Sequence, residues 1–363
     1  MTPTFLRVNL GERSYDIVVA HQEIGGVGAF ARRLSQGNKA FIVTDANVAK
    51  HAQTVAASLK RIGLESDLAV RPAGENQKSL TVAAELYDRL VACHADRQTL
   101  VAAVGGGVVG DLAGFVAATF NRGLPLLMVP TTLLAMVDSS VGGKVAVNHP
   151  RGKNLIGTFH QPAGVWIDTA MLATLPERDY KSGLAEVVKY GVILDPELFA
   201  YLEANAAAIL RKDPAVMPYI ILRCCRLKAD IVERDEREES GLRAVLNYGH
   251  TFAHAFETAA GYGVWLHGEA VAAGMICASR LAEKRGLISS DISERQRRLL
   301  KAFALPIVPD AWPIDALLET MSRDKKSLVG KMRFVLPRQL GEVALFDDVP
   351  EAQVRQVLED SRK

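Results

Sequence analysis

The sequence predicts two domains: a Rossmann-like α/β N-terminal domain with a mostly parallel sheet, and a predominantly α-helical C-terminal domain. Strand-like and helix-like segments alternate in the first half, and periodic segments rich in Ala, Leu, Glu and Lys dominate after about residue 175. The length of 363 residues also exceeds what one hydrophobic core usually serves. We therefore place the domain boundary between residues 177 and 178, which gives domains 1–177 and 178–363.

The first half opens with two strand-like segments, 5–10 and 15–20, whose intervening turn residues predict a hairpin. Further short apolar runs predict strands, and the segments between them predict helices that end near residues 62 and 93. These strands are expected at 40–44, 67–70, 100–104, 126–129 and 165–167. Strand, helix and strand in repetition predict a largely parallel sheet with helices on both faces.

The second half is dominated by helical periodicity, with one late strand-like patch at 332–336. Helices are expected at 186–194, 196–211, 217–234, 251–260, 269–284 and 292–303. The most apolar stretch of the chain, 101–120, is long enough to suggest a membrane span. It contains Asp111 and five glycines, which favour a buried strand, a tight turn and the start of a helix.

The charge balance argues against several partners. The 43 basic and 41 acidic side chains give a net charge of +2, so there is no electrostatic reason to expect nucleic acid or an anionic membrane. The four cysteines lack metal-ligand spacing and are expected to be reduced thiols of a cytoplasmic protein. The first sixteen residues have no apolar core, so we expect no signal peptide there.

A glycine-rich segment, Gly105 to Asp111, follows an apolar strand and opens a helix. Glycines at such a turn let the backbone approach a pyrophosphate while helix N–H groups face it. The alternative is a close-packed corner, since the strand is not the first one and Asp111 follows at once. Asp45, at the end of an early strand, could hold a ribose or serve only as a turn residue.

Three histidines and a glutamate suggest a metal site. His250 and His254 are four residues apart, so a helix would place both on one face, and His267 precedes another helix. With Glu186, two imidazoles and a carboxylate are typical of an open zinc site. The alternative is that these histidines cap helices or satisfy hydrogen bonds in the core. Three of the eight histidines within eighteen positions favour the metal.

Short polar segments after the apolar runs suggest an anion or polyol site. They are 130–132, 138–144 and 152–154, and each supplies hydroxyls, glycine or lysine in apolar surroundings. Such groups suit a phosphate bound in a dry pocket. Each segment taken separately could also be an ordinary loop.

Taken together, these segments resemble the dehydroquinate synthase family closely. The blocks that carry the resemblance run in order from Gly74 to Lys326: GENQK, GGGVVGD, FNRG, PTTLLAMVDSSVGGK, GKNLIGTF, GLAEVVKYG, DEREESGLRAVLNYGHTFAHAFE, LHGEAVAAGM and DKK. The resemblance implies a dehydroquinate synthase-like fold. It also implies a zinc site formed by Glu186, His250 and His267, which would accept cobalt as well.

The resemblance further assigns cofactor and substrate positions in this chain. NAD is expected to contact Asp45, Asn47, Gly74, Glu75, Lys78, Gly106, Gly107, Val108, Val109, Gly110, Asp111, Thr131, Thr132, Lys144, Lys153, Met171, Leu172, Ala173 and Thr174. Catalytic and substrate-binding roles are expected for Asp138, Lys144, Lys153, Asn154, Lys189, Lys228, Arg243, Asn247, His254, and Lys325 or Lys326. In the family, an arginine at the Arg122 position reaches a neighbouring subunit's site, which implies a homodimer.

The implied activity is the conversion of 3-deoxy-D-arabino-heptulosonate 7-phosphate to 3-dehydroquinate and phosphate, in the shikimate pathway of aromatic amino acid biosynthesis. It proceeds by transient oxidation with NAD, phosphate elimination, re-reduction and intramolecular aldol closure. The small-molecule partner would therefore be a phosphorylated sugar acid.

Three alternatives stay open. A related cyclase for a substrate without a carboxylate is disfavoured by Lys228 and Arg243, where the family binds the acid group. An NAD-dependent polyol or glycerol-type metal dehydrogenase is disfavoured by the many basic groups of the expected site. A metal- and nucleotide-binding regulatory protein is disfavoured because the substrate-binding side chains are all present.

Overall fold

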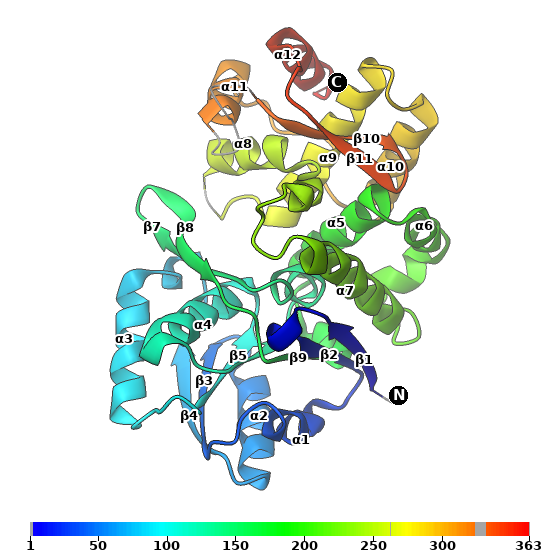
Figure 1. Ribbon diagram of the computed structural model, residues 1–363. Coiled ribbons are helices and arrows are strands. Elements are labelled where there is room, and N and C mark those ends of the chain that lie inside the picture. Colours follow the sequence, from blue (N-terminus) through cyan, green and yellow to red (C-terminus); the bar gives the residue numbers. More distant parts are fainter. Residues whose placement is uncertain (1–2, 262, 324–331, 363) are drawn as a thin grey trace. The chain divides into compact units, whose positions relative to one another are not determined.

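The chain divides into two units in the computed structural model, which describes residues 3–261, 263–323 and 332–362 (Figure 1). The first unit comprises Met1–Leu175 and Met217–Arg237, and the second comprises Pro176–Val216 and Glu238–Lys363. The chain first passes from the first unit to the second after residue 175, two residues before the boundary expected after residue 177. Residues 217–237, which we expected in the second domain, belong to the first unit instead.

A seven-stranded sheet forms the centre of the first unit, in the order β1-β2-β9-β6-β5-β3-β4. β1 pairs antiparallel with β2, and every other pairing in this sheet is parallel. The predicted hairpin and the largely parallel sheet are therefore confirmed. The strands are β1 (Thr4–Val8), β2 (Tyr15–Ala20), β3 (Lys39–Asp45), β4 (Glu65–Arg71), β5 (Leu100–Gly105), β6 (Leu126–Pro130) and β9 (Gly164–Asp168).

Four helices accompany these strands: α1 (Val27–Arg32), α2 (Ala49–Arg61), α3 (Leu80–Ala92) and α4 (Gly107–Thr119). Ser79 begins α3 as its N-cap, where its hydroxyl accepts a hydrogen bond from the Val82 amide. The apolar stretch 101–120 forms β5 and α4, as its glycines predicted. α2 packs on β3 and β4, and α4 packs on β5 and β6.

A second hairpin, which the sequence suggested only as loops, packs on α4. It consists of β7 (Lys144–His149) and β8 (Gly152–Phe159) in antiparallel register. Gly114 allows the close approach of α4 to β7, because a Cβ at this position would lie 2.3 Å from a methyl carbon of Val145. β8 is largely exposed, so the alternation that marks a half-buried strand is missing from its sequence.

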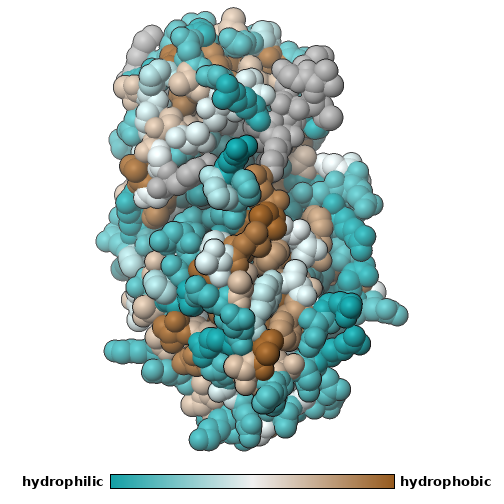
Figure 2. Space-filling model, turned by 90° about the vertical axis from the view of Figure 1, so that its left-hand side faces the viewer, coloured by the Kyte–Doolittle hydropathy of each residue, from teal (hydrophilic) through white to brown (hydrophobic). Residues whose placement is uncertain are grey.

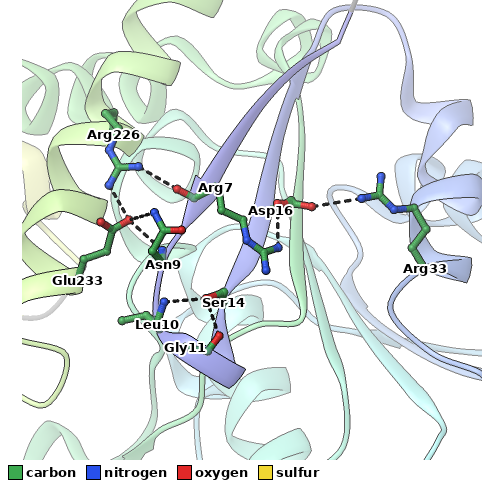
Figure 3. Close-up of polar contacts among 9 residues, drawn as sticks. All are labelled: Arg7, Asn9, Leu10, Gly11, Ser14, Asp16, Arg33, Arg226 and Glu233. Atoms are coloured by element: carbon green, nitrogen blue, oxygen red, sulfur yellow. Dashed lines mark hydrogen bonds and ion pairs between the residues drawn. The ribbon is translucent and has the colours of Figure 1, made fainter.

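Helix α7 (Met217–Arg234) returns to the first unit because both its apolar and its polar side chains find partners there. It packs on β1, on β2 and on the short π-helix η5 (Ala135–Ser139). Figure 3 shows the polar contacts: Arg226 donates to the Arg7 carbonyl at 2.8 Å and to Glu233 at 2.7 Å. Glu233 in turn accepts a hydrogen bond of 2.9 Å from the Asn9 amide.

The second unit is mainly helical, as predicted, with one small hairpin. Asp195 and Pro196 start α6, since the Asp195 carboxylate accepts two backbone amides and proline suits the first turn. α5 begins nine residues earlier than expected, and α11, α12 and β11 had no sequence prediction. The elements are α5 (Glu177–Ile193), α6 (Pro196–Leu210), α8 (His250–Ala260), α9 (His267–Lys284), α10 (Ser290–Ala302), α11 (Ile314–Arg323), β10 (Phe334–Gln339), β11 (Glu342–Phe346) and α12 (Glu351–Asp360).

Within the part of the chain that the structure describes, every helix is too short or too polar to cross a lipid bilayer.

Replacing Glu233 with glutamine is expected to lower the melting temperature at pH 7 by about 2–4 °C, because losing a partly buried ion pair costs about 1 kcal/mol. Burial opposes ionisation of Glu233, but hydrogen bonds from Arg226 and Asn9 outweigh it and lower the pKa of the carboxyl below 4.5. Its stabilisation is therefore present above the unfolded pKa and is lost as pH falls through the folded pKa. The melting curves of parent and variant should converge below pH 4.5.

The control is Glu65→Gln, since Glu65 is an exposed residue at the start of β4. Its curve should follow the parent at every pH. A Glu233→Gln difference that persisted unchanged at pH 3 would contradict the ion-pair explanation.

Candidate active site

The residues expected to bind a dinucleotide share one edge of the seven-stranded sheet. Asp45 ends β3, Glu75 follows β4, Gly106 follows β5, Thr131 follows β6 and Thr174 follows β9. Because these strands are parallel, their carboxyl ends meet at the same edge. This edge is where open α/β sheets bind their ligands. The fold thus brings together positions that lie up to 129 residues apart in the chain.

The glycine-rich turn between β5 and α4 contains both features that the sequence left as alternatives. Gly105 is a packing glycine, because a Cβ there would lie 2.6 Å from the Val109 side chain. Gly106 and Gly110 line a hollow beside Ser139 and Met128 that has room for no more than about one water molecule. The N-terminal amides of α4 begin at this turn, and such amides are the groups that bind an anion or a pyrophosphate in other proteins.

A polar network connects the expected cofactor and substrate positions of the first unit. The Lys78 ammonium binds the Asp111 carboxylate and donates to the Asn154 side-chain oxygen at 2.5 Å. Asn148 donates to Glu75 at 2.8 Å and accepts the Asn154 amide at 2.9 Å. Asn148 was absent from the sequence-predicted site, because an asparagine within a polar loop carries no distinguishing signal.

One feature of this network is energetically costly. Burial raises the pKa of the Asp111 carboxyl above its ordinary value, although the Lys78 ammonium opposes that shift. A buried charge persists where its surroundings hold it in place, and such charges are frequent at functional sites. Asn154 has a φ of 55°, in the left-handed region that asparagine adopts more readily than other residues with a side chain.

Lys228 and Asp138, two expected substrate residues, form a direct ion pair. The Lys228 ammonium lies 2.6 Å from the Asp138 carboxylate and 2.5 Å from its carbonyl oxygen. Asp138 belongs to the π-helix η5, a rare conformation that is frequent at functional sites. The return of α7 to the first unit explains this pair. Lys144 is an exposed residue at the start of β7, and Lys153 lies in β8.

Glu186, His250 and His267 come together in the second unit. The three residues come from α5, α8 and α9, and each offers one ligand atom within 4.8 Å of the others. The Glu186 Oε1 atom lies 3.6 Å from His250 Nε2 and 3.4 Å from His267 Nε2. His254 lies edge-on to His250, with the ring centres 5.7 Å apart, and is not part of this set.

The spacing of these atoms fits a tetrahedral metal ion. Ligand atoms about 2.1 Å from zinc in tetrahedral geometry are about 3.4 Å from one another. The observed separations of 3.4 and 3.6 Å match that edge length. Two imidazoles and one carboxylate leave further coordination positions for oxygen atoms of a substrate or water.

The charges around the cluster also suit a cation. The Glu186 side chain is fully buried and forms an ion pair with Lys189, which is 2% exposed. Burial lowers the pKa of His267, but Glu186 and Glu257 outweigh burial and raise this pKa to about 10. The same two carboxylates that hold a proton on His267 would attract a divalent cation.

The first turn of α9 is held tightly against α5. Gly268 has no room for a side chain, because a Cβ there would lie 1.8 Å from the Ser182 carbonyl oxygen. Glu269 caps the helix by accepting the Leu266 amide at 2.8 Å. Arg178 of α5 makes two hydrogen bonds of 2.7 Å to Glu269. These contacts determine how far His267, the first residue of α9, lies from α5.

The remaining expected residues occupy separate places. Arg243 and Asn247 lie in the 3-10 helix η7 (Leu242–Asn247), where the Arg243 side chain is 2% exposed and lies 3.5 Å from Glu238. Arg122 is exposed on the first unit. Lys325 and Lys326 lie outside the described residues.

A dinucleotide-type turn at the carboxyl edge of a parallel sheet and a His₂Glu cluster in a helical unit define a class of enzymes that combine a nucleotide cofactor with a metal ion. The chain matches the 3-dehydroquinate synthase N-terminal family over residues 68–182 and the 3-dehydroquinate synthase C-terminal family over residues 183–327. The chain belongs to the 3-dehydroquinate synthase family.

Two relatives illustrate this membership. The 3-dehydroquinate synthase of Desulforamulus reducens is 52% identical over 355 residues, which cover 97% of this chain and 99% of that protein. The 3-dehydroquinate synthase of Geobacter metallireducens is 51% identical over 337 residues, 93% of each chain.

Solved structures extend the comparison to cofactors. A 2-deoxy-scyllo-inosose synthase in complex with carbaglucose-6-phosphate, NAD⁺ and Co²⁺ has a TM-score of 0.89 at 27% identity, covering 98% of this chain and 100% of that one. The 2-epi-5-epi-valiolone synthase of Streptomyces hygroscopicus, with NAD⁺ and Zn²⁺ bound, has a TM-score of 0.89 at 31% identity, covering 97% and 98%. An iron-containing alcohol dehydrogenase shares only the fold, with a TM-score of 0.68 at 14% identity over 100% and 99%.

Replacing Gly268 with alanine is expected to displace the first turn of α9 and to separate His267 from Glu186. Affinity for zinc or cobalt should fall at least tenfold, and the melting temperature should fall because overpacking costs about 1–3 kcal/mol. Competition with a chromogenic chelator measures the affinity.

The control is Gly25→Ala, where a new Cβ would meet only the Arg61 side chain, at an ordinary 3.6 Å. This variant should bind metal like the parent. Parental metal affinity in Gly268→Ala would show that the α5–α9 contact does not control the cluster.

Proposed function

We propose that this enzyme, a carbon–oxygen lyase, converts 3-deoxy-D-arabino-heptulosonate 7-phosphate to 3-dehydroquinate and inorganic phosphate, with NAD and zinc as cofactors. The observation that carries the proposal is the 52% identity to a 3-dehydroquinate synthase over 97% of this chain. The His₂Glu cluster offers ligands for the metal, and the glycine-rich turn offers the N-terminal amides of α4 for the pyrophosphate of NAD. Cobalt, which one structural neighbour binds, would suit the same ligands.

The chemistry divides between cofactors and side chains. When bound, NAD would take a hydride from the substrate and return it, and the metal would polarise the reacting oxygen as a Lewis acid. The chain's own residues bind and orient the substrate and stabilise charge. The buried Lys228 and Arg243 supply fixed positive charge for the carboxylate and the departing phosphate, and the exposed Lys144 adds a further ammonium. Lys189 forms an ion pair with the buried Glu186 carboxylate, so its ammonium is held at the metal cluster.

The nearest alternative is a cyclase that acts on a substrate without a carboxylate, as the synthase bound to carbaglucose-6-phosphate suggests. Two observations favour the sugar acid. Identity is about 50% to the 3-dehydroquinate synthases and only 27% and 31% to the two synthase structures. Lys228 and Arg243, which the family resemblance assigns to the acid group, are both present and nearly buried. A polyol dehydrogenase has weaker support, because such enzymes share only the fold.

We also infer a homodimer. The exposed Arg122 has a φ of 67°, a strained conformation for a residue with a long side chain. Figure 2 views the face on which α3, α4 and the β7–β8 hairpin lie in Figure 1, and it shows apolar side chains gathered among hydrophilic ones. Leu155 and Phe159 of β8 are 39% and 40% exposed. Exposed apolar strands favour pairing between chains. Sedimentation equilibrium giving the mass of one chain would contradict the dimer.

We place the enzyme in the cytoplasm and its reaction in the shikimate pathway of aromatic amino acid biosynthesis. None of the four cysteines, all of them described residues, is disulfide-bonded, which suits a reducing compartment. Recovery of a tagged chain from the membrane or extracellular fraction would contradict this placement, and growth of a deletion strain without aromatic amino acids would contradict the pathway.

Phosphate release from 3-deoxy-D-arabino-heptulosonate 7-phosphate tests the proposed function directly. Release should require NAD, should stop after chelator treatment and should return when zinc or cobalt is added. Absorbance at 340 nm should show no net NADH, because the hydride returns to the substrate within one cycle. A phosphorylated sugar without a carboxylate should release little phosphate.

Stoichiometric NADH from an unphosphorylated polyol would instead identify a dehydrogenase. Faster turnover of the sugar phosphate that lacks a carboxylate would identify the related cyclase.

Replacing Arg243 with alanine should raise the KM for the sugar acid at least tenfold and change the dissociation constant of NAD less than twofold. The buried guanidinium is expected to pair with the substrate carboxylate, and a charged hydrogen bond is worth about 1.5–3 kcal/mol. Steady-state kinetics and NAD titration measure the two quantities. Arg298→Ala, at an exposed position of α10, is the matched control. Equal losses for substrate and NAD would contradict the carboxylate-binding role.

A further inference from the structure

A second glutamate, Glu257, lies beside the His267 ring on the side opposite to Glu186. The Glu257 Oε1 atom lies 3.6 Å from His267 Nδ1, and the other ring nitrogen, Nε2, lies 3.4 Å from Glu186. Glu257 is only 12% exposed. It lies in α8 seven residues after His250, which places both on one face of the helix. The His267 ring is therefore enclosed between two carboxylates.

His250 has the same arrangement with a different oxygen. Its Nδ1 atom lies 3.1 Å from the Tyr248 carbonyl oxygen, and its Nε2 atom faces Glu186 at 3.6 Å. Because a carbonyl oxygen can only accept, this contact requires the proton of neutral His250 to sit on Nδ1. Both histidines thus direct Nε2 toward Glu186 and Nδ1 toward an oxygen.

This orientation matters because a neutral imidazole has one donor and one acceptor nitrogen. A histidine that binds a metal commonly donates its other N–H to a carboxylate or carbonyl, which fixes the tautomer and the orientation of the ring. Tyr248 can do this for His250 with its backbone, whatever its side chain is. For His267, Glu257 is the group in that position, and its contribution depends on the side chain.

We propose that Glu257 is a positioning residue that holds His267 with Nε2 as the metal donor and adds negative charge to the cluster. The inference rests on the proposed function, since it concerns the metal site of that function. Glu257 faces the ring nitrogen opposite to the one near Glu186, so it acts through His267 and not on the metal itself.

Charge supports a second part of the same role. Glu257 brings a second carboxylate to the cluster, beside the Glu186 carboxylate that pairs with Lys189. A divalent cation is therefore held more strongly when Glu257 is present and ionised.

Two substitutions separate orientation from charge. Glu257→Gln keeps the length of the side chain and an oxygen that can accept from Nδ1, but removes the charge. Glu257→Ala removes both. The full-length protein is stripped with a chelator and reloaded, and zinc affinity is measured by competition with a chromogenic chelator. The visible absorption of the cobalt-loaded protein reports the ligand geometry, and the melting curve of the metal-free protein reports the fold.

Glu257→Ala should bind zinc about 10–100-fold more weakly than the parent, and its cobalt spectrum should change. Glu257→Gln should lose part of the affinity but keep the parental cobalt spectrum, because the ring stays oriented. The metal-free forms of both variants should still unfold cooperatively, which shows that the fold is intact. The control is Glu283→Ala, sixteen residues and about 24 Å along α9 from His267, and it should match the parent throughout.

Zinc affinity of Glu257→Ala within twofold of the parent, with an unchanged cobalt spectrum, would overturn the inference. So would parental zinc affinity in Glu257→Gln combined with loss of cooperative unfolding in metal-free Glu257→Ala, which would make the residue merely structural. A parental protein that binds no zinc would overturn the proposed metal site as well. Turnover of the parent is measured separately, so failure of the activity and failure of the positioning role are distinguishable.

Discussion

The metal cluster depends on how closely the backbone of α9 approaches α5. Ser182 and Glu186 lie on one face of α5, four residues apart, and Gly268 follows His267 directly in α9. Gly268 contacts the Ser182 backbone without an intervening side chain. Ser182 lies about one helical turn from Glu186, so this contact is close to the buried Glu186 carboxylate. Glu186 and His267 are therefore brought to 3.4 Å by main-chain packing. A longer side chain at the contact would separate the ligands.

The first unit uses a related constraint at the carboxyl edge of its sheet. Gly105 packs against Val109 so that α4 starts immediately after β5, and Gly106 and Gly110 line a hollow in the same turn. Around this turn, charged side chains are held by one another, as Lys78 is by Asp111. The glycines leave space at this turn. Lys78 and Asp111 lie close to it, so a charged ligand bound there could replace one partner of their ion pair.

The sequence predicted the helices and strands that are specified by the pattern of neighbouring residues. Period-2 and period-3.6 patterns located most strands and helices, and helix 217–234 was predicted at its observed ends. The patterns could not show which unit that helix joins, because an apolar face does not specify its partner. The β7–β8 hairpin was missed because β8 is exposed, which removes the alternation that marks a half-buried strand.

The candidate site shows the same division. Glu186, His250 and His267 were predictable because few residue types bind zinc, and the structure brings them together. Glu257 and Asn148 were not, because a glutamate in a helix or an asparagine in a loop is ordinary until its neighbours are known. The family resemblance named ligands and substrate contacts, but the neighbours of these residues appear only when distances between segments far apart in the sequence are measured.

The position of α7 has a consequence for how the first unit is completed. The segment 1–175 supplies the whole seven-stranded sheet. Helix α7 also belongs to this unit, although residues 176–216, which precede it in the chain, belong to the second unit. Its buried face, which includes Cys225 against the Met136 carbonyl, covers β1, β2 and the π-helix. A fragment ending at residue 177 would leave these surfaces exposed and Asp138 without its Lys228 partner. The position at which the sequence changes from alternating to mainly helical patterns is therefore not the boundary between the two compact units. The first unit needs a helix from beyond that position, and the same helix provides an ammonium group of the expected site.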